Sequence, residues 1–351
     1  AGRFAEIAEA EVLRARHPGA GRVELPHHLM MPGFIDTHTH LTQSLGKSLV
    51  FGEPSEIFRR IWVPLEGSLD EHMVYLSAKL AALECLRGGF TTAVDAGTRS
   101  AGHVGRLADA ARETGLRTVI ARICNDLGGS AEIPDRDSIL RSAEAHLAHY
   151  AGDPLIHPSL AISIPEAASD GMLRDVARLA AEAGAVFQTH VNEHLAAVER
   201  SVIARGRRPL EHLAHVGALG PQTLIAHATL VTPSELTLLR ETGTAVAYNP
   251  VASVWKGNAV APALQMQAQY LAQYPNISVT IEGHADEQGT REYNVALGAR
   301  RANAAREYLI SRGVPSSRLR TISYGKERPV ATCSDPSCYA QNRRAVTVIA
   351  A

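Results

Sequence analysis

The chain of 351 residues is long enough for one large domain or two ordinary ones, and its 45% hydrophobic and 20% charged content is ordinary for a globular protein. Its 35 basic and 36 acidic side chains leave a net charge of -1, which argues against a nucleic-acid binder and against electrostatic attachment to a membrane. No apolar run approaches the roughly 20 residues of a membrane span, so we expect no transmembrane segment.

Between residues 32 and 262, short β-type runs alternate with helical stretches rich in Ala, Leu, Glu and Arg. The expected strands are Gly33–Thr37, Thr91–Asp95, Thr118–Ile123, Leu160–Ile164, Val186–His190, Thr223–His227 and Ala245–Tyr248. The expected helices are Glu71–Leu86, Gly105–Thr114, Gly171–Ala183 and Pro233–Glu241. This alternation predicts an α/β fold of the (β/α)8 TIM-barrel type that lacks its eighth strand. A doubly wound open sheet is the alternative, but it normally carries a glycine-rich loop where this chain has histidines.

After residue 263 the pattern changes. "LQMQAQYLAQYP" predicts a helix, "NISVTIEGHAD" a strand, and "EYNVALGARRANAAREYLISRG" a long amphipathic helix closed by Gly313. "LRTISYG" and "RRAVTVIA" are typical of two further strands. We therefore expect a barrel domain over residues 1–263 and an α+β domain over residues 264–351.

Histidines stand at the ends of three expected strands. His38 and His40, in "PGFIDTHTHL", point to the same side of a strand because they are two residues apart. "VFQTHVNEH" places His190 at a second strand end with Glu193 close behind, and "TLIAHATL" places His227 at a third. The carboxyl ends of barrel strands meet at one mouth, so these side chains are predicted to converge on one site.

The convergence favours a metal site over the simpler interpretation. A single histidine at a strand end is more often a satisfied core or surface residue, and an H-x-H pair alone is a weak signal. The same feature at three strand ends fits one divalent ion, either zinc or iron, held by imidazoles. Such an ion lowers the pKa of a bound water from 15.7 toward about 7, which supplies hydroxide for hydrolysis.

Residues from about 23 to 262 resemble the metal-dependent amidohydrolase superfamily, in its branch of cytosine, guanine and S-adenosylhomocysteine deaminases. The matching segments are "MPGFIDTHTHL", "GGFTTAVDAG", "THVNE", "LIAHATLVTPSEL" and "YNPVASVWKGNAVAP". The resemblance implies that His38, His40 and His190 bind the metal. It also implies that Glu193 moves a proton to the substrate ring and that His227 orients the hydroxide and stabilises the developing oxyanion. The implied reaction is hydrolytic deamination of a small aminated heterocycle of purine, pyrimidine or triazine type.

The family ends its eighth strand with an Asp that binds metal and acts as general base, in a "GTD"-like turn. No such turn follows Asn249 and Pro250 here, so impaired activity is expected. One hypothesis is that Ile277–Glu282 serves as the eighth strand and presents Asp286 as the last metal ligand.

Residues from about 264 to 351 resemble the OmpA-like domain of peptidoglycan-associated lipoproteins, without its first strand. The matching segments are "VTIEGHADEQGTREYNVALGARRANA", "SRLRTISYGKERPV" and "AQNRRAVTV". The resemblance implies that Asp286 and Arg301 bind the diaminopimelate of peptidoglycan, where a carboxylate pairs with ammonium and a guanidinium with carboxylate. It also gives the family's cysteine pair a counterpart in Cys333 and Cys338, whose spacing suits a small disulfide loop.

Three interpretations therefore compete: a metal-dependent deaminase, a cell-wall anchor, and a non-functional hybrid of two truncated families joined near residues 262–264. An open barrel in the last case would expose strand edges and favour aggregation. The absence of an export signal suggests the cytoplasm, whereas a functional C-terminal module suggests the periplasm.

Overall fold

The structure of this chain is a computed structural model that describes residues 5–50, 57–100, 104–127, 135–255, 263–332, 334 and 336–349. The chain divides into a small unit, Ala1–Gly33, and a large unit, Phe34–Ala351. The small unit contains helix α1 (Ala10–Arg16), which buries no side chain. None of the helices in the described ranges is both long and apolar enough to cross a membrane.

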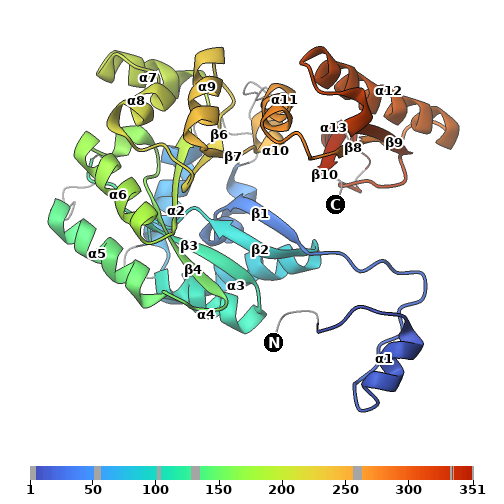
Figure 1. Cartoon of the computed structure of the whole chain (residues 1–351). Coiled ribbons are helices and arrows are strands. Elements are labelled where there is room, and N and C mark those ends of the chain that lie inside the picture. The colour runs from blue at the N-terminus through green and yellow to red at the C-terminus, as the bar shows by residue number, and fades with distance from the viewer. Residues whose placement is uncertain are drawn as a thin grey trace. The chain divides into compact units, whose positions relative to one another are not determined.

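Seven parallel strands form one sheet in the order of the chain (Figure 1). They are β1 (Phe34–Thr39), β2 (Phe90–Asp95), β3 (Arg117–Ile123), β4 (Ile156–Ala161), β5 (Val186–Val191), β6 (Thr223–His227) and β7 (Ala245–Ala247). Each strand pairs with the next, and no pairing between β1 and β7 closes the sheet in the part of the chain that the structure describes. The prediction of an incomplete (β/α) barrel is confirmed.

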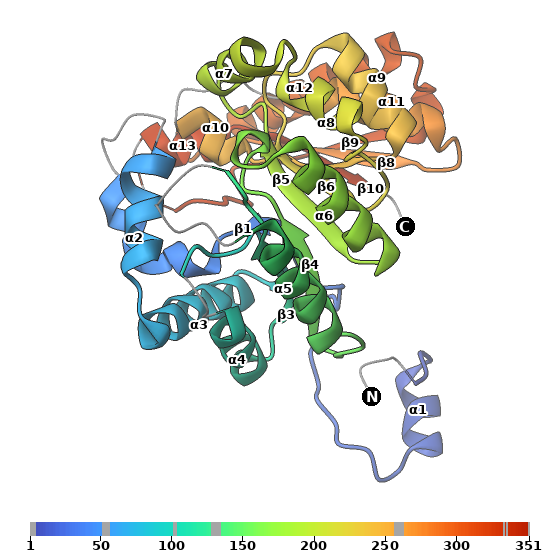
Figure 2. The same ribbon diagram turned by 90° about the vertical axis from the view of Figure 1, so that its left-hand side faces the viewer.

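Helices connect and cover these strands (Figure 2). They are η1 (Leu41–Val50), η2 (Phe58–Trp62), α2 (Val63–Ser68), α3 (Glu71–Arg87), α4 (Val104–Thr114), α5 (Arg136–His149), η3 (Pro165–Ala167), α6 (Asp170–Glu182), α7 (Leu195–Arg205), α8 (Pro209–Val216), α9 (Pro233–Thr242) and α10 (Pro250–Trp255). Several begin where a side chain accepts a hydrogen bond from the first turn, as Asp70 does for α3, Ser169 for α6 and Thr232 for α9. Helix α4 packs on β3, and α6 packs on β4 and β5.

The largest apolar core lies between the strands β4–β6 and the helices that cover them. Leu160, Phe187 and Ile225 contribute one fully buried side chain from each of these strands, and Leu173 and Val176 of α6 pack in the same cluster. Each fully buried side chain of this size stabilises the folded state by about 1.5–3 kcal/mol. This packing fixes the relative positions of the strand ends.

One expected strand lies four residues from its predicted position. Strand β4 begins at Ile156 and not at Leu160, because Asp153 accepts hydrogen bonds from the backbone of Leu155 and Ile156 at 2.9 Å and ends the preceding turn. The sequence disfavoured a strand here because Pro158, within β4, has no backbone N–H to donate. The remaining six expected strands of the sheet lie within two residues of their predicted bounds.

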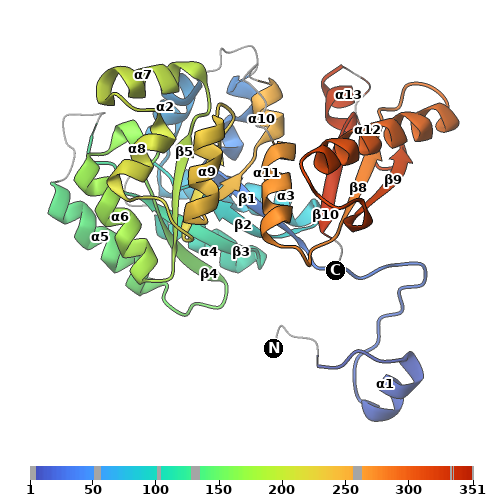
Figure 3. The ribbon, with the colours of Figure 1, turned by 45° about the horizontal axis from the view of Figure 1, so that its top comes forward.

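A separate three-stranded sheet lies in the C-terminal part (Figure 3). Its strands β8 (Val279–His284), β9 (Leu319–Gly325) and β10 (Ala345–Ile349) are accompanied by α11 (Ala263–Gln273), α12 (Arg291–Ser311), η4 (Ser316–Arg318) and α13 (Pro336–Asn342). The hypothesis that Ile277–Glu282 closes the barrel is wrong. Strand β8 runs parallel to β9 and antiparallel to β10, so its backbone hydrogen bonds are made within this sheet.

Two glycines allow α12 to lie directly against β8. A Cβ atom on Gly298 of α12 would lie 2.7 Å from the carbonyl oxygen of Gly283 in β8, and it would also meet Ser323 Oγ. Real Cβ atoms essentially never approach another heavy atom that closely, and the carbonyl of Gly283 belongs to the backbone of β8, which cannot rotate away as a side chain can.

We predict that Gly298→Ala destabilises the C-terminal sheet by about 1–3 kcal/mol, the usual cost of overpacking. The helix propensity of alanine offsets at most about 1 kcal/mol of this. Thermal unfolding followed by circular dichroism measures the change. Gly105→Ala in α4 is the matched control, because a Cβ there meets nothing within 4 Å and should be neutral or stabilising. Equal effects of the two substitutions would contradict the close-approach explanation.

Candidate metal centre

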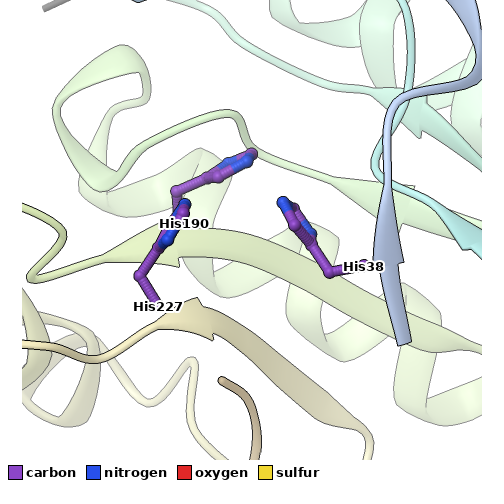
Figure 4. A group of neighbouring side chains, drawn as sticks. All are labelled: His38, His190 and His227. Carbon is purple, nitrogen blue, oxygen red and sulfur yellow. The ribbon is translucent and has the colours of Figure 1, made fainter. Parts of the chain in front are cut away.

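Three histidines from separate strand ends face one space (Figure 4). His38 comes from β1, His190 from β5 and His227 from the last residue of β6, and their ligand atoms lie within 4.8 Å of one another. His40, which follows β1, joins them because its Nε2 lies 3.2 Å from Nε2 of His190. The structure thus brings together all four histidines that the sequence placed at the mouth of the barrel.

Burial favours the neutral form of two of these imidazoles. It lowers the pKa of His190 to about 4, and it lowers the pKa of His40 well below the usual range, an effect to which the charge of Arg99 and any protonation of His38 or His190 would add. His190 donates from Nδ1 to the carbonyl oxygen of Ser163 at 2.7 Å, which leaves the lone pair on Nε2 directed into the cluster. Neutral imidazoles with lone pairs facing one space fit a divalent ion such as zinc or iron.

His227 differs from the other three in its partners. Its Nδ1 lies 3.4 Å from Nδ2 of Asn249, an atom that only donates, so the ring proton belongs on Nε2. That Nε2 lies 3.7 Å from Oε1 of Glu193, which follows β5 by two residues. The distances alone would admit His227 as a metal ligand, but this tautomer suits a hydrogen-bond donor.

The backbone at these two strand ends adopts left-handed conformations that residues other than glycine rarely take. The φ angles are +52° at Asn192, +75° at His227 and +48° at Ala228. Each costs about 1–3 kcal/mol and persists only when its surroundings fix it. Asn192 is held by hydrogen bonds from Nδ2 to the carbonyl of Leu230 and to Oε1 of Glu235, at 3.1 and 3.0 Å. This strain turns the chain so that Glu193 and His227 face each other.

The histidines line a cavity of about 930 Å³ at the mouth of the barrel. Its wall includes the aromatic side chains of Phe58, Trp62 and Phe90. Its polar lining, besides the four histidines and Glu193, includes Asp36, Gln43, Lys47, Glu166, Asn192, His194, Arg200, Tyr248 and Asn249. A cavity of this size with apolar walls and a few convergent polar groups suits a small heterocyclic molecule.

A buried ion pair next to the cavity, which the sequence did not reveal, helps to hold the residues of the site in place. The fully buried carboxylate of Glu66 accepts from Arg99 Nη1 at 2.8 Å and also from Thr42 and Gln43. Arg99 in turn donates to Ser163 Oγ at 3.1 Å, and its guanidinium lies 4.3 Å from the centre of the Phe58 ring. The pair therefore connects the cavity wall to the residue whose carbonyl orients His190.

The two residues expected to bind peptidoglycan lie near the end of β8. Asp286 accepts from the backbone of Gln288 at 3.1 Å and from Arg343, and it does not belong to the histidine cluster. Arg301 of α12 donates to the carbonyl oxygen of His284 at 2.9 Å. Cys338 is disulfide-bonded, and Cys333 lies outside the described residues.

The comparison with protein families identifies the larger part of the chain. Residues 29–273 match the amidohydrolase family. The chain belongs to the amidohydrolase family. Residues 258–343 of this amidohydrolase also match the OmpA family, which confirms the second resemblance. The two matches overlap over residues 258–273, so a domain boundary at residues 263 and 264 stays a prediction.

Individual relatives come from both families. A peptidoglycan-associated lipoprotein of Rhizobium meliloti (strain 1021) is 73% identical over 86 residues, which are 24% of this chain and 49% of that protein. A 5'-deoxyadenosine deaminase of Methanopyrus kandleri is 30% identical over 288 residues, which are 81% of this chain and 64% of that protein. The amidohydrolase described here thus spans about half the length of the first relative and less than two thirds of the second.

A solved structure shows the same fold. The crystal structure of an adenosine deaminase from Xanthomonas campestris with bound zinc superposes with a TM-score of 0.62 at 24% identity. The likeness covers 68% of this chain and 54% of that one. At this identity it shows the shared TIM-barrel architecture and carries no further conclusion about activity.

We predict that Arg99→Met destabilises the protein by about 3–5 kcal/mol, because it leaves the buried carboxylate of Glu66 without its cation. Urea unfolding followed by tryptophan fluorescence measures the loss. The double variant Glu66→Met/Arg99→Met should be more stable than Arg99→Met alone. Arg178→Met, which removes an exposed pair with Glu182, should change stability by less than about 1 kcal/mol. A single variant as stable as this control would rule out the support role.

Proposed function

We propose that the chain is a metal-dependent hydrolase that removes an amino group from a nitrogen heterocycle of purine, pyrimidine or triazine type. The observation that carries the proposal is the meeting of four histidines and Glu193 at one cavity, from strand ends far apart in the sequence. Membership of the amidohydrolase family and relatives that are named deaminases support this reaction class.

His38, His40 and His190 are the residues proposed to hold one divalent ion, zinc or iron. Ser163 fixes the tautomer of His190 through its carbonyl oxygen, which keeps a lone pair on Nε2. The ion, when bound, lowers the pKa of a coordinated water so that a hydroxide nucleophile is available near neutral pH.

Glu193 is proposed to carry protons and His227 to stabilise charge. The carboxylate of Glu193 takes a proton from the attacking water and gives it to the ring nitrogen next to the reacting carbon. This transfer makes the carbon more electrophilic, and a positioned acid or base of this kind is worth about 100- to 10,000-fold in rate. The bond from that carbon to the amino group then breaks, and the amino group leaves as ammonia with the second proton of the added water, so that a ring carbonyl remains. His227, protonated at Nε2, donates to the oxygen that develops negative charge at the tetrahedral carbon.

The proposed site lacks the acidic residue that the family supplies from an eighth strand. In the ranges that the structure describes, no eighth strand pairs with β7 or β1, and Asp286 follows β8, a strand of the other sheet. Because that residue serves the family as ligand and as general base, turnover is expected to be about 100- to 10,000-fold below that of a complete site.

Metal content and ammonia release test the proposal separately. Purified protein incubated with zinc and then dialysed should retain the ion, and it should release ammonia slowly from adenine nucleosides. His190→Ala should lose most of the zinc, since removing one of three ligands weakens binding strongly. His215→Ala, which removes an exposed histidine of α8, is the matched control and should retain it.

Glu193→Gln distinguishes catalysis from metal binding. Its zinc content should equal that of the wild type, whereas ammonia release should fall by at least about 100-fold. Zinc retained by His190→Ala, or full activity of Glu193→Gln, would refute the assigned roles.

A second function, attachment to peptidoglycan, is supported by the 73% identity of the C-terminal part to a peptidoglycan-associated lipoprotein. Asp286 and Arg301 lie at the same end of β8, where they are proposed to pair with the ammonium and carboxylate of diaminopimelate. Arg301→Ala should then lose co-sedimentation with purified peptidoglycan. Arg306→Ala, on the same helix and paired with Glu307, should not. Equal sedimentation of both variants would exclude the assignment to Arg301.

A further inference from the structure

Glu166 is a carboxylate on the cavity wall that the proposed reaction does not use. It lies in η3, the short turn that follows β4, and it lines the same cavity as the histidines. Strand β4 pairs with β5, and Ser163, three residues before Glu166, accepts the hydrogen bond from His190. Glu166 therefore lies in the turn after β4, the strand that neighbours the one carrying His190.

One oxygen of this carboxylate is buried without a partner. Oε1 of Glu166 is inaccessible to solvent and has no hydrogen-bond partner among the described residues. A carboxylate accepts hydrogen bonds and cannot donate them, so only an N–H or O–H group can satisfy it. Leaving a buried acceptor unsatisfied is costly, more so when it carries charge. The last torsion of a glutamate side chain is broad, so a rotation of the carboxylate can present this oxygen to the cavity that Glu166 lines, where a donor from a bound molecule would satisfy it.

The carboxylate of Glu166 is available to a ligand, because the cations discussed above pair with other carboxylates. It forms no ion pair with any described residue, whereas Lys47 on the same cavity wall is held by Glu84. The guanidinium of Arg99 is similarly engaged, by the buried carboxylate of Glu66. The wall thus offers an acceptor with negative charge, which favours a ligand that presents N–H groups.

The rest of the wall indicates the shape of that ligand. Phe58, Trp62 and Phe90 line the same cavity, and aromatic side chains favour contact with a flat ring. A flat ring whose reacting carbon faces the histidines has further ring edges directed at the wall. An amino group on such an edge would supply the donor that Oε1 lacks.

We propose that Glu166 is a specificity-determining residue that accepts a hydrogen bond from a second amino group of the substrate, one that the reaction does not remove. The preferred substrates are then diamino heterocycles, and their monoamino analogues bind less well. This inference rests on the function proposed above, because it assumes that an aminated heterocycle occupies the cavity.

Binding of a matched pair of compounds tests the proposal without requiring turnover. 2,6-Diamino-9-methylpurine and 9-methyladenine differ by one amino group, and methylation removes the ring N–H that would otherwise confuse the comparison. Titration calorimetry on the zinc-loaded protein should show the diamino compound binding about 10- to 100-fold more tightly, as a hydrogen bond to a charged group provides.

Variants of Glu166 should change this ratio. Glu166→Gln, which keeps the shape and removes the charge, should reduce the ratio several-fold, and Glu166→Leu should bring it close to 1. Glu182→Gln, which removes an exposed carboxylate of α6 that pairs with Arg178, should leave it unchanged. Circular dichroism checks that each variant is folded.

The outcomes separate this inference from the function proposed above. A wild-type ratio near 1, no binding of either compound to the wild type, or an unchanged ratio in folded Glu166→Gln protein overturns the role of Glu166. A high wild-type ratio that Glu166→Gln lowers, without ammonia release from either compound, supports Glu166 as the recognition residue and refutes the deaminase proposal.

Discussion

The alignment of parallel strand ends is the constraint on which the site depends. Side chains that are more than 180 residues apart, such as His38 and His227, meet because β1 and β6 run in the same direction within one sheet. The apolar core packs against β4, β5 and β6 and fixes their positions along the strand direction. A shift of one strand by a single residue would turn its histidine away from the cluster. The chemistry of the cavity therefore rests on packing between strands and helices that never touch a ligand.

Electrostatics then determines what the cluster can bind. Four imidazoles crowded together would repel one another if protonated, and burial adds a further cost of charging them. Both effects lower the pKa of His190, to about 4, and that of His40, which favours the neutral form of these two rings. The nearby cation Arg99 acts in the same direction, while Glu66 compensates its charge within the protein. Neutral imidazole nitrogens can donate lone pairs to a metal. A pocket lined by them therefore favours a small divalent cation over a proton.

The sequence was sufficient for six of the seven strands of the larger sheet and for the histidines, because strand ends have a recognisable pattern and a single architecture brings them together. It misplaced β4, in which Pro158 interrupts the usual strand pattern. The sequence did not reveal polar residues whose role depends on a partner or a cavity formed by residues far away in the chain. Glu66 and Arg99 are 33 residues apart, and each alone is typical of a solvated charge. Glu166 likewise resembles a polar turn residue until the cavity is seen. The misplaced eighth strand has another cause: the order of elements does not specify pairing, and β8 finds its partners in β9 and β10.

In the part of the chain that the structure describes, β1 and β7 do not pair, and this has a consequence for access. Ile35 and Asp36 of β1 line the cavity, and so does Phe90 at the start of β2, so the hollow extends down along the first strand. In a closed barrel a neighbouring strand would cover that flank. Among the described residues no paired strand does so, and the residence time of any bound ion should therefore depend on how well this side is shielded as much as on the strength of its ligands.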